Sequence, residues 1–281
     1  LFFQEAIHFN FYYTALIIFQ NKYFKLNMKI ASWNVNGIRA RLDHVSDWLQ
    51  INKPDVLTLQ ETKVMDEMFP LDAFKPLGYQ INIYGQKSYN GVAVLTKKPL
   101  TEINKGISGF KDDQTRVIAG TYNGVLIINV YVPNGQSVGS EKFDYKMRWL
   151  KHFYTYLQTL LKTHQKIVIL GDFNIAPADI DVHDPELWKN KVLCSENERE
   201  WLNQILGLGF VDSFRLFEQQ ERLYSWWDYR AAAYRRKMGM RIDLILISEA
   251  LKKDCMKSYI DETPRGQDKP SDHAPVLIEL S

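Results

Sequence analysis

The chain has 281 residues, of which 46% are hydrophobic and 24% charged, a balance typical of a folded globular protein. This excludes wholesale disorder, a collagen-like repeat and a coiled-coil rod. The 35 basic and 33 acidic residues leave a formal charge of +2, which neither favours nor excludes a nucleic-acid partner. Because Cys194 and Cys255 lie far apart in the sequence, we expect neither a disulfide scaffold nor a cysteine-based zinc site, and a reducing compartment is allowed.

The first 27 residues differ in pattern from the rest of the chain. Their longest apolar stretch, 11–19, is interrupted by Thr14 and is too short to span a bilayer. It also lacks the preceding basic segment and the following small-residue cleavage site of a secretory signal. We therefore expect residues 1–27 to be an extension outside the fold and residues 28–281 to form a single domain. The alternative is a membrane-surface or partner-binding segment.

From Met28 onward, short apolar runs alternate with amphipathic stretches. The apolar runs predict buried strands at 29–34, 55–60, 92–96, 116–121, 125–132, 166–171, 242–248 and 275–280. Helices are expected at 43–51, 142–163 and 196–206, the last opened by a capping box of Ser195 and Glu198. Because no Pro/Gly/Ser-rich linker or internal repeat interrupts this region, the pattern predicts one α/β domain.

Acidic and amide residues stand where the predicted strands end. The strings SWNVNG (32–37), LQET (59–62), GDFN (171–174) and RID (241–243) supply Asn34, Glu61, Asp172, Asn174 and Asp243. A fifth string, PSDHAP (270–275), holds Asp272 and His273 in a loop bounded by prolines. Each residue alone is more readily explained as a turn former or cap. Five such strings in one chain, however, favour a shared site beyond the strand ends.

The residue types in these strings indicate a hard divalent cation. Carboxylate and amide oxygens suit Mg²⁺ or Mn²⁺, and Glu61 is a good candidate ligand. Zinc is disfavoured because the chain has no H-E-x-x-H and no paired cysteines. The sequence also contains no P-loop and no G-x-S-x-G, which argues against a P-loop nucleotidase and against a hydrolase nucleophile elbow.

Residues 222–241 form a basic stretch with interleaved aromatic side chains. The sequence RLYSWWDYRAAAYRRKMGMR contains six Lys/Arg and one acid, Asp228. Basic groups among aromatics suit contact with a nucleic-acid backbone and stacking on bases. Taken alone, this window is better explained as a solvated charged face over core aromatics.

The segment from Met28 to Ser281 resembles the bacterial exonuclease III family of abasic-site DNA endonucleases. The resemblance is carried by SWNVNGIRAR (32–41), LQETK (59–63), YNGVAVL (89–95), NVYVPNG (129–135), GDFNIAP (171–177), EREWL (198–202), YSWWDYR (224–230), MRIDLIL (240–246) and KPSDHAPV (269–276). It implies a four-layered α/β/β/α sandwich with two face-to-face mixed sheets and helices outside. Residues 1–27 have no counterpart in the family pattern.

The resemblance implies a Mg²⁺-dependent DNA-repair phosphodiesterase, with Mn²⁺ as a second cation that could serve. The enzyme would cleave duplex DNA 5′ to abasic sites and act in base excision repair. It would also have 3′→5′ exonuclease, 3′-phosphatase and 3′-phosphodiesterase activity. Its partner would be duplex DNA with abasic sites or blocked 3′ ends. No membrane or obligate protein partner is implied, so we expect a cytoplasmic monomer.

The resemblance also implies a role for each matching residue. Glu61 corresponds to the principal Mg²⁺ ligand, and Asn34 to the residue that orients the metal and the base. Asp172 corresponds to the carboxylate that positions or deprotonates the attacking water. Asn174 and Tyr131 would contact the scissile phosphate, and His273, oriented by Asp243, would bind it. The expected metal site comprises Glu61, Asn34, Asp172, Asn174, Asp272 and His273, with the role of Asp272 the least defined.

For substrate binding, the resemblance places Trp226, Met240 and Ile242 around the pocket for the extrahelical abasic sugar. Arg230 and Arg241 of the basic stretch are expected to contact DNA. Met240 stands where some relatives carry Trp, which leaves the selectivity of the pocket open. Unstacking a nucleotide is easiest at a damaged, unpaired site, which is itself a source of selectivity.

Two other functions remain open at this stage. A phosphoesterase of the same fold could act on a lipid or small-molecule phosphate, and it would not need the basic stretch 222–241. A catalytically inert DNA-binding module would require the replacement of at least one of Glu61, Asp172, Asn174, Asp243 or His273, and all of these are present.

Overall fold

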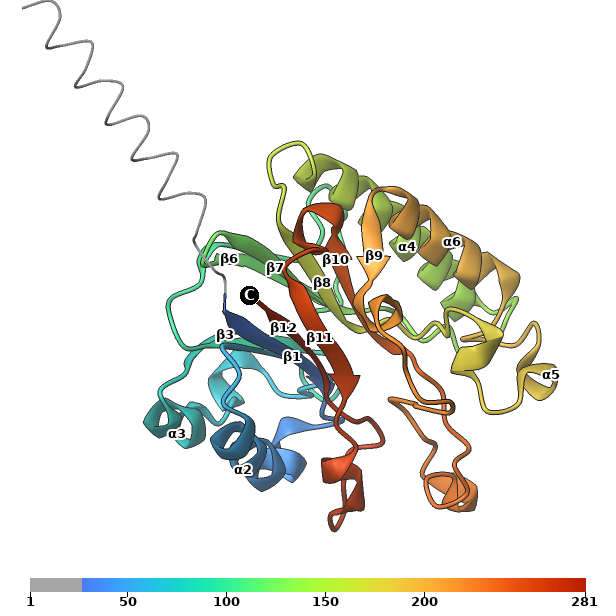
Figure 1. Cartoon of the computed structure of the whole chain (residues 1–281), viewed down its shortest axis with the longest axis horizontal. Helices are drawn as coiled ribbons and strands as arrows, with labels where there is room; N and C mark the ends of the chain where they lie inside the picture. Colours follow the sequence, from blue (N-terminus) through green and yellow to red (C-terminus); the bar gives the residue numbers. More distant parts are fainter. Residues whose placement is uncertain (1–26) are drawn as a thin grey trace, which may run out of the picture.

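The computed structural model describes residues 27–281, so the extension expected at the N-terminus lies, except for Asn27, outside the described residues. Two six-stranded mixed sheets form the centre of the domain (Figure 1). The first sheet has the order β11-β12-β1-β2-β4-β3. Its strands are β1 (Met28–Asn34), β2 (Val56–Gln60), β3 (Gln80–Tyr84), β4 (Val92–Thr96), β11 (Cys255–Ile260) and β12 (Val276–Leu280).

The second sheet has the order β5-β6-β7-β8-β10-β9. Its strands are β5 (Thr101–Lys105), β6 (Val117–Tyr122), β7 (Val125–Tyr131), β8 (Ile167–Asp172), β9 (Phe210–Asp212) and β10 (Asp243–Ser248). Each sheet has one parallel pair, β1 with β2 and β7 with β8, and its other neighbours are antiparallel.

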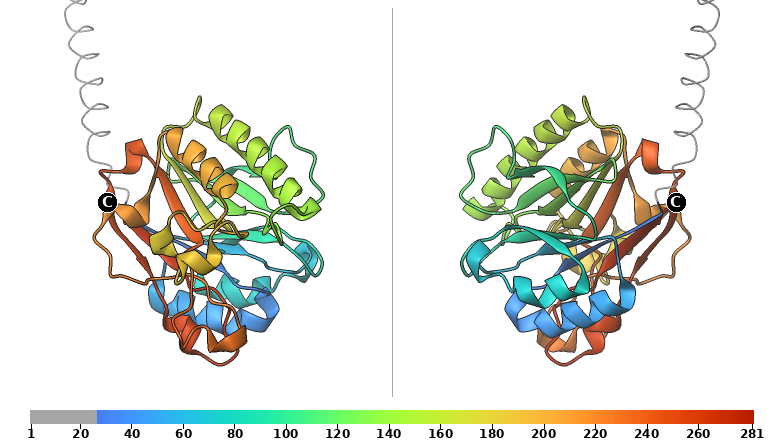
Figure 2. Two further views of the ribbon diagram at one scale, coloured as in Figure 1. Left: turned by 90° about the vertical axis from the view of Figure 1, so that its right-hand side faces the viewer. Right: turned by 90° about the vertical axis from the view of Figure 1, so that its left-hand side faces the viewer.

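Helices cover the outer face of each sheet, which confirms the four-layered sandwich (Figures 1 and 2). The first sheet packs against α2 (Leu42–Asn52) and α3 (Leu71–Phe74), and the second against α4 (Glu141–Leu160) and α6 (Glu196–Gly207). A short helix, α5 (Pro185–Trp188), follows β8. None of the helices between residues 27 and 281 combines the length and apolar character that a bilayer crossing requires.

The alternation of side chains along β7 shows how one strand serves two cores. Val125 and Ile127 point into the core between the sheets, whereas Leu126 and Ile128 point toward the helices. Both faces of the strand are therefore apolar, because a strand sandwiched between two layers has no solvent face. This explains why the central strands are recognisable in the sequence as continuous apolar runs.

A polar bridge joins the two sheets near the site described below. Asn129 of β7 donates from Nδ2 to the carbonyls of Leu59 (3.0 Å) and Ala93 (2.9 Å) in the first sheet. Its Oδ1 accepts from Gln60 Nε2 at 2.7 Å. Because buried polar groups are tolerated only when they are hydrogen-bonded, this network specifies how the sheets are placed relative to each other.

The eight predicted strands are confirmed to within one residue at each end. The predicted helix 142–163 begins and ends earlier, at Glu141–Leu160. The capping box is confirmed, since Ser195 and Glu198 cap α6 reciprocally. Four strands were not predicted, β3, β5, β9 and β11, and these are the four edge strands of the two sheets.

Candidate active site

Strand register aligns three of the expected site residues on one sheet. Asp172, the last residue of β8, is the direct partner of Tyr131 on β7 and of Asp243 on β10. In the first sheet, Asn34 ends β1, and Glu61 directly follows β2. The ends of both sheets therefore deliver their polar side chains to one place, as expected for strand ends in α/β proteins.

Glu61, Asp172 and His273 form a compact group that could hold a metal ion. One potential ligand atom from each lies within 4.8 Å of the other two. Asn34 joins the two carboxylates, because its Nδ2 donates to Glu61 Oε1 at 3.0 Å and to Asp172 Oδ2 at 2.9 Å. Oxygen ligands of this kind fit Mg²⁺ or Mn²⁺. Asn34 thus orients the carboxylates through its amide nitrogen, and its Oδ1 accepts from the backbone of Asn36.

The Asp172 carboxyl is buried, with 1% of its surface exposed. Burial raises its pKa to about 7; His273 opposes this shift, while Asp243 and Glu61 add to it. The backbone N–H of Asn174 donates to Asp172 Oδ1 at 2.8 Å and fixes the carboxyl group. A carboxyl group whose pKa lies close to neutral pH suits a general base.

His273 is held between two carboxylates. Its Nδ1 lies 2.8 Å from Asp243 Oδ2, and its Nε2 lies 3.8 Å from Asp172 Oδ2. Burial alone would lower the pKa of His273, but Asp243 and Asp172 outweigh that effect and raise the pKa to about 10. The imidazole is therefore protonated at neutral pH, so it presents a positive charge to an anionic ligand and leaves the two carboxylates to hold a metal ion.

Glu61 remains charged although it is mostly buried. Burial opposes ionisation, but the ammonium of Lys63 and the amide of Asn34 outweigh burial and lower the pKa of Glu61. Lys63 Nζ lies 2.8 Å from Glu61 Oε2 and also donates to Asn36 Oδ1. Lys63 was not among the expected site residues, although it belongs to the LQETK string that carries the resemblance.

Asn174 and Tyr131 complete the wall of the site. Asn174 has a left-handed backbone (φ 49°), and its Nδ2 donates to the carbonyl of Val132 (3.0 Å) and to Asp172 Oδ2 (3.2 Å). Burial and the nearby Glu61 hold the pKa of the Tyr131 phenol well above its usual value. Tyr131 is therefore protonated at neutral pH, where its phenol can donate a hydrogen bond.

The metal group opens into a cavity of about 710 Å³. Trp226 and Ile242, which were expected around the substrate pocket, line it together with Arg230, Glu61, Asp172 and His273. Asp272 also lines this cavity but lies outside the compact metal group. Its carboxylate accepts from Trp226 Nε1 (3.1 Å) and from Asn36 Nδ2 (2.9 Å), so it orients the pocket wall.

Arg241 and Met240 differ from expectation. The prediction that the Arg241 side chain contacts DNA is wrong, because 1% of it is exposed and it pairs with Asp181 (2.6 Å) and Asp212 (2.7 Å). Met240 is fully buried and packs behind Trp226 rather than lining the cavity. Arg230 is exposed, and Asp228 pairs with it. A charge in the sequence does not reveal whether a partner already neutralises it within the fold.

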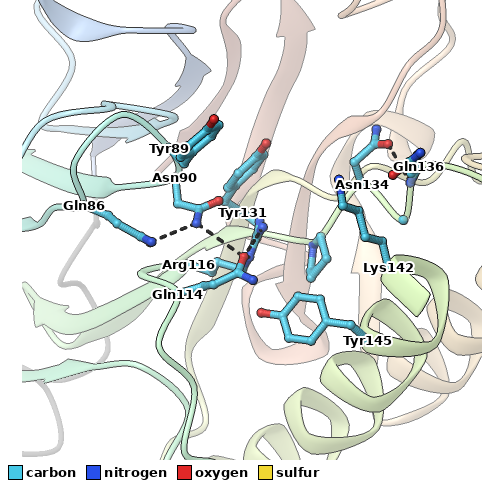
Figure 3. A pocket seen from close by; sticks show the side chains of 12 residues that line it. Gln86, Tyr89, Asn90, Gln114, Arg116, Tyr131, Asn134, Gln136, Lys142 and Tyr145 are labelled. Carbon is cyan, nitrogen blue, oxygen red and sulfur yellow. Dashed lines mark hydrogen bonds between the residues drawn. The ribbon is translucent and has the colours of Figure 1, made fainter. Parts of the chain in front are cut away.

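A second cavity, of about 750 Å³, adjoins the first and shares Tyr131, Asn134 and Gln136 with it (Figure 3). Arg116 and Lys142 supply positive charge, and no acidic side chain is among the residues of the described chain that line it. The guanidinium of Arg116 lies 4.7 Å from the Tyr131 ring centroid and bonds Gln114. This surface was not predicted from the sequence, because its residues come from four separate segments.

Comparisons with known proteins agree with this geometry. Residues 31–273 match the endonuclease/exonuclease/phosphatase family. The chain is 38% identical to exodeoxyribonuclease III of Haemophilus influenzae over 269 residues, which cover 90% of this chain and 100% of that protein. It is 34% identical to the DNA repair nuclease APEX1 of Danio rerio over 262 residues, which cover 91% of this chain and 83% of that protein.

Solved structures show the same similarity. The 3′ phosphatase NExo from Neisseria, solved with a product DNA hairpin, superposes with a TM-score of 0.89 at 42% identity, covering 90% of this chain and 99% of that chain. An AP endonuclease from Archaeoglobus fulgidus superposes with a TM-score of 0.86 at 40% identity, with the same coverage of both chains.

Proposed function

Because this chain belongs to the endonuclease/exonuclease/phosphatase family, we propose that it is a metal-dependent DNA-repair phosphodiesterase. It cleaves duplex DNA 5′ to abasic sites and removes nucleotides, phosphates and other blocking groups from 3′ ends. The observation that carries the proposal is the convergence of Glu61, Asp172 and His273 within 4.8 Å in a cavity shared with Trp226. A monomer in the cytoplasm, with duplex DNA as its partner, suffices for this activity.

The donor set of the site fits a Mg²⁺ ion, and Mn²⁺ would fit the same ligands. Glu61 and Asp172 would hold the ion, and Asn34 would keep their carboxylates in place. When bound, such an ion polarises the phosphoryl group and stabilises the leaving oxygen. The lowered pKa of Glu61 ensures that its ligand oxygen is charged at neutral pH.

The remaining groups perform the proton transfer and charge stabilisation. Asp172, whose pKa is about 7, accepts a proton from the attacking water. The His273 imidazolium faces the phosphate with its Nε2–H and stabilises the negative charge that grows during attack. The phenol of Tyr131 donates a hydrogen bond to the scissile phosphate. Asn174 contacts the phosphate through Nδ2 by exchanging its longer bond to Asp172.

The second cavity supports a polyanionic substrate rather than a small phosphate ester. Tyr131 lines both cavities, and Arg116 and Lys142 line the second one (Figure 3). Cationic groups of this kind position the phosphodiester backbone without reading its sequence.

A duplex of defined sequence, labelled at its 5′ end and carrying one abasic analogue, tests this function. With Mg²⁺ we expect a single incision 5′ to the lesion, and with EDTA we expect none. Binding without incision would indicate an inert DNA-binding protein. Inertness toward DNA, together with turnover of a phospholipid or inositol phosphate, would indicate a phosphoesterase of a different substrate class.

A further inference from the structure

A buried ion pair lies behind the active-site loops. Lys146 of α4 and Glu198 of α6 pair with each other, and neither side chain has any exposed surface. Lys146 occupies a core position of α4, between the buried Phe143 and Leu150. A charged pair at such a position is unfavourable unless further hydrogen bonds compensate for the lost water. The other hydrogen bonds of the Lys146 ammonium and the Glu198 carboxylate therefore indicate the role of this pair.

The Lys146 ammonium uses all three of its donors on active-site loops and on its partner. Nζ donates to the carbonyl of Asn174 at 2.7 Å, to the carbonyl of Asn134 at 3.2 Å and to Glu198 Oε1. An ammonium group has three N–H donors, so its hydrogen-bonding capacity is fully satisfied. One side chain thus joins the loop that follows β7 to the loop that follows β8.

Glu198 extends the connection to a third loop. Its Oε1 also accepts from the backbone N–H of Leu193 (3.0 Å), and its Oε2 accepts from the N–H of Ser195 (3.0 Å). Leu193 lines the cavity that contains the metal group. The capping box of α6 therefore serves both the helix and the shape of the pocket.

A short chain of hydrogen bonds leads from this pair to the reacting groups. Asn134 Nδ2 donates to Asn174 Oδ1 at 3.0 Å, so Lys146 fixes the main chains of two residues whose side chains also bond each other. Asn174 in turn holds both oxygens of Asp172, through its backbone N–H (2.8 Å) and through Nδ2 (3.2 Å). The general base is thus two hydrogen bonds away from Lys146.

We propose that Lys146 is a positioning residue of the hydrolytic reaction, with Glu198 as its counter-charge. By holding the carbonyls of Asn134 and Asn174, it fixes the Asp172 carboxylate and the Asn174 amide against the scissile phosphate. This inference rests on the proposed nuclease function. Because a displacement of about 1 Å can reduce a rate by about 10²-fold, the loss of this contact should lower kcat while leaving DNA binding nearly unchanged.

The deciding variant is Lys146→Met combined with Glu198→Gln. The pair of substitutions removes both buried charges, and the Gln side-chain oxygen can still accept from the backbone N–H of Ser195 in the capping box. We expect kcat for incision to fall by roughly 10–100-fold, with KM within about threefold of wild type. Lys151→Met, on the exposed side of the same helix, is the matched control and should leave both constants unchanged. A kcat of the paired variant within about threefold of wild type would overturn the proposal.

Lys146→Arg provides a second test that keeps the charge opposite Glu198. Its guanidinium retains donors for the two carbonyls, so we expect kcat within about fivefold of wild type. A loss of kcat in Lys146→Arg as large as that of the paired variant would overturn the proposal. If the paired variant does not fold, a loss as large as that of Asn174→Ala would overturn it. Wild-type incision measured in parallel separates the proposed nuclease function from the positioning role of Lys146. If the protein is not a nuclease, no sample will cleave the duplex, whereas a wrong positioning role leaves wild-type incision intact.

Discussion

His273 Nδ1 lies 2.8 Å from Asp243 Oδ2, and both side chains are buried. Asp243 stands beside Asp172 across a register pair of β10 and β8, so the histidine is placed against the second sheet although its own loop precedes β12 of the first. The contact therefore joins the two halves of the sandwich at the point where the proposed chemistry occurs. It also sets the charge of the imidazole, from which the first prediction follows.

The rate of incision should show two limbs with pH. It should rise as the pH increases through about 7, because Asp172 must lose its proton to act as a base, and bound cation will move this limb lower. It should fall as the pH passes about 10, where His273 loses its charge. In Asp243→Asn the alkaline limb should move to lower pH, because the largest contribution that raises the pKa of His273 is removed. Asp144→Asn, on the exposed face of α4, should leave the profile unchanged, and an unshifted limb in Asp243→Asn would contradict the assignment.

Asn174→Ala should lower kcat by roughly 10²–10³-fold, the loss typical of removing one donor that stabilises developing negative charge. The substitution also removes a hydrogen bond to Asp172. Steady-state incision of the abasic duplex measures the effect, with Asn197→Ala on the exposed surface of α6 as control. A loss of less than about tenfold would remove Asn174 from the transition-state contacts.

Mg²⁺ should stabilise the protein in the absence of DNA. At a concentration of about 100 times Kd, a ligand that binds only the folded state adds about 2.7 kcal/mol to the free energy of unfolding. For a domain of this size, that corresponds to a rise in Tm of roughly 5–10 °C. Glu61→Gln should abolish most of this rise, because it removes the charged ligand oxygen. Thermal melting with and without Mg²⁺ tests this, and an equal rise in the variant would place the cation elsewhere.

Arg241→Ala should lower the free energy of unfolding by about 3–5 kcal/mol, because it removes a buried guanidinium that pairs with both Asp181 and Asp212 and leaves Asp181 with Arg215 alone. Any loss of DNA binding in this variant should result from its lower stability and not from a lost phosphate contact. Arg230→Ala provides the contrast. Because Arg230 is exposed, this substitution should leave the free energy of unfolding nearly unchanged. It should, however, reduce the dependence of DNA binding on salt concentration. Urea denaturation and salt-dependent DNA binding would show the opposite pattern if Arg241 were the DNA contact.

The edge strands are the part of the fold that could not be predicted from the sequence. The eight inner strands are apolar on both faces, so their position was clear in the sequence. In β5, by contrast, only Asn104 is partly buried, and in β11 only Cys255 and Ser258 are buried. An edge strand needs little apolar surface and is often charged, so the sequence pattern does not separate it from a loop. Its pairing is decided by the neighbouring strand.

The candidate site was predictable where residue type and strand end coincided. Glu61, Asp172 and His273 were placed in one site from their strings and from the family resemblance. Lys146 could not be found in this way, because a lysine within an amphipathic helix is usually exposed and nothing local indicates burial. Arg241 was misjudged for the converse reason, since Asp181 and Asp212, which neutralise it, lie 60 and 29 residues away.

The sequence by itself determined which segments are apolar enough to form the inner strands and which hard-ligand side chains follow them. Both are local properties, dictated by hydrophobic spacing and by the chemistry of single residues. Only the tertiary structure decided which charges are neutralised, which carbonyls the buried ammonium of Lys146 bonds, and how far the carboxylates lie from the imidazole. These features depend on contacts between residues that are distant in the chain. Burial strengthens the electrostatic interactions at these contacts, because it removes the water that would otherwise screen them.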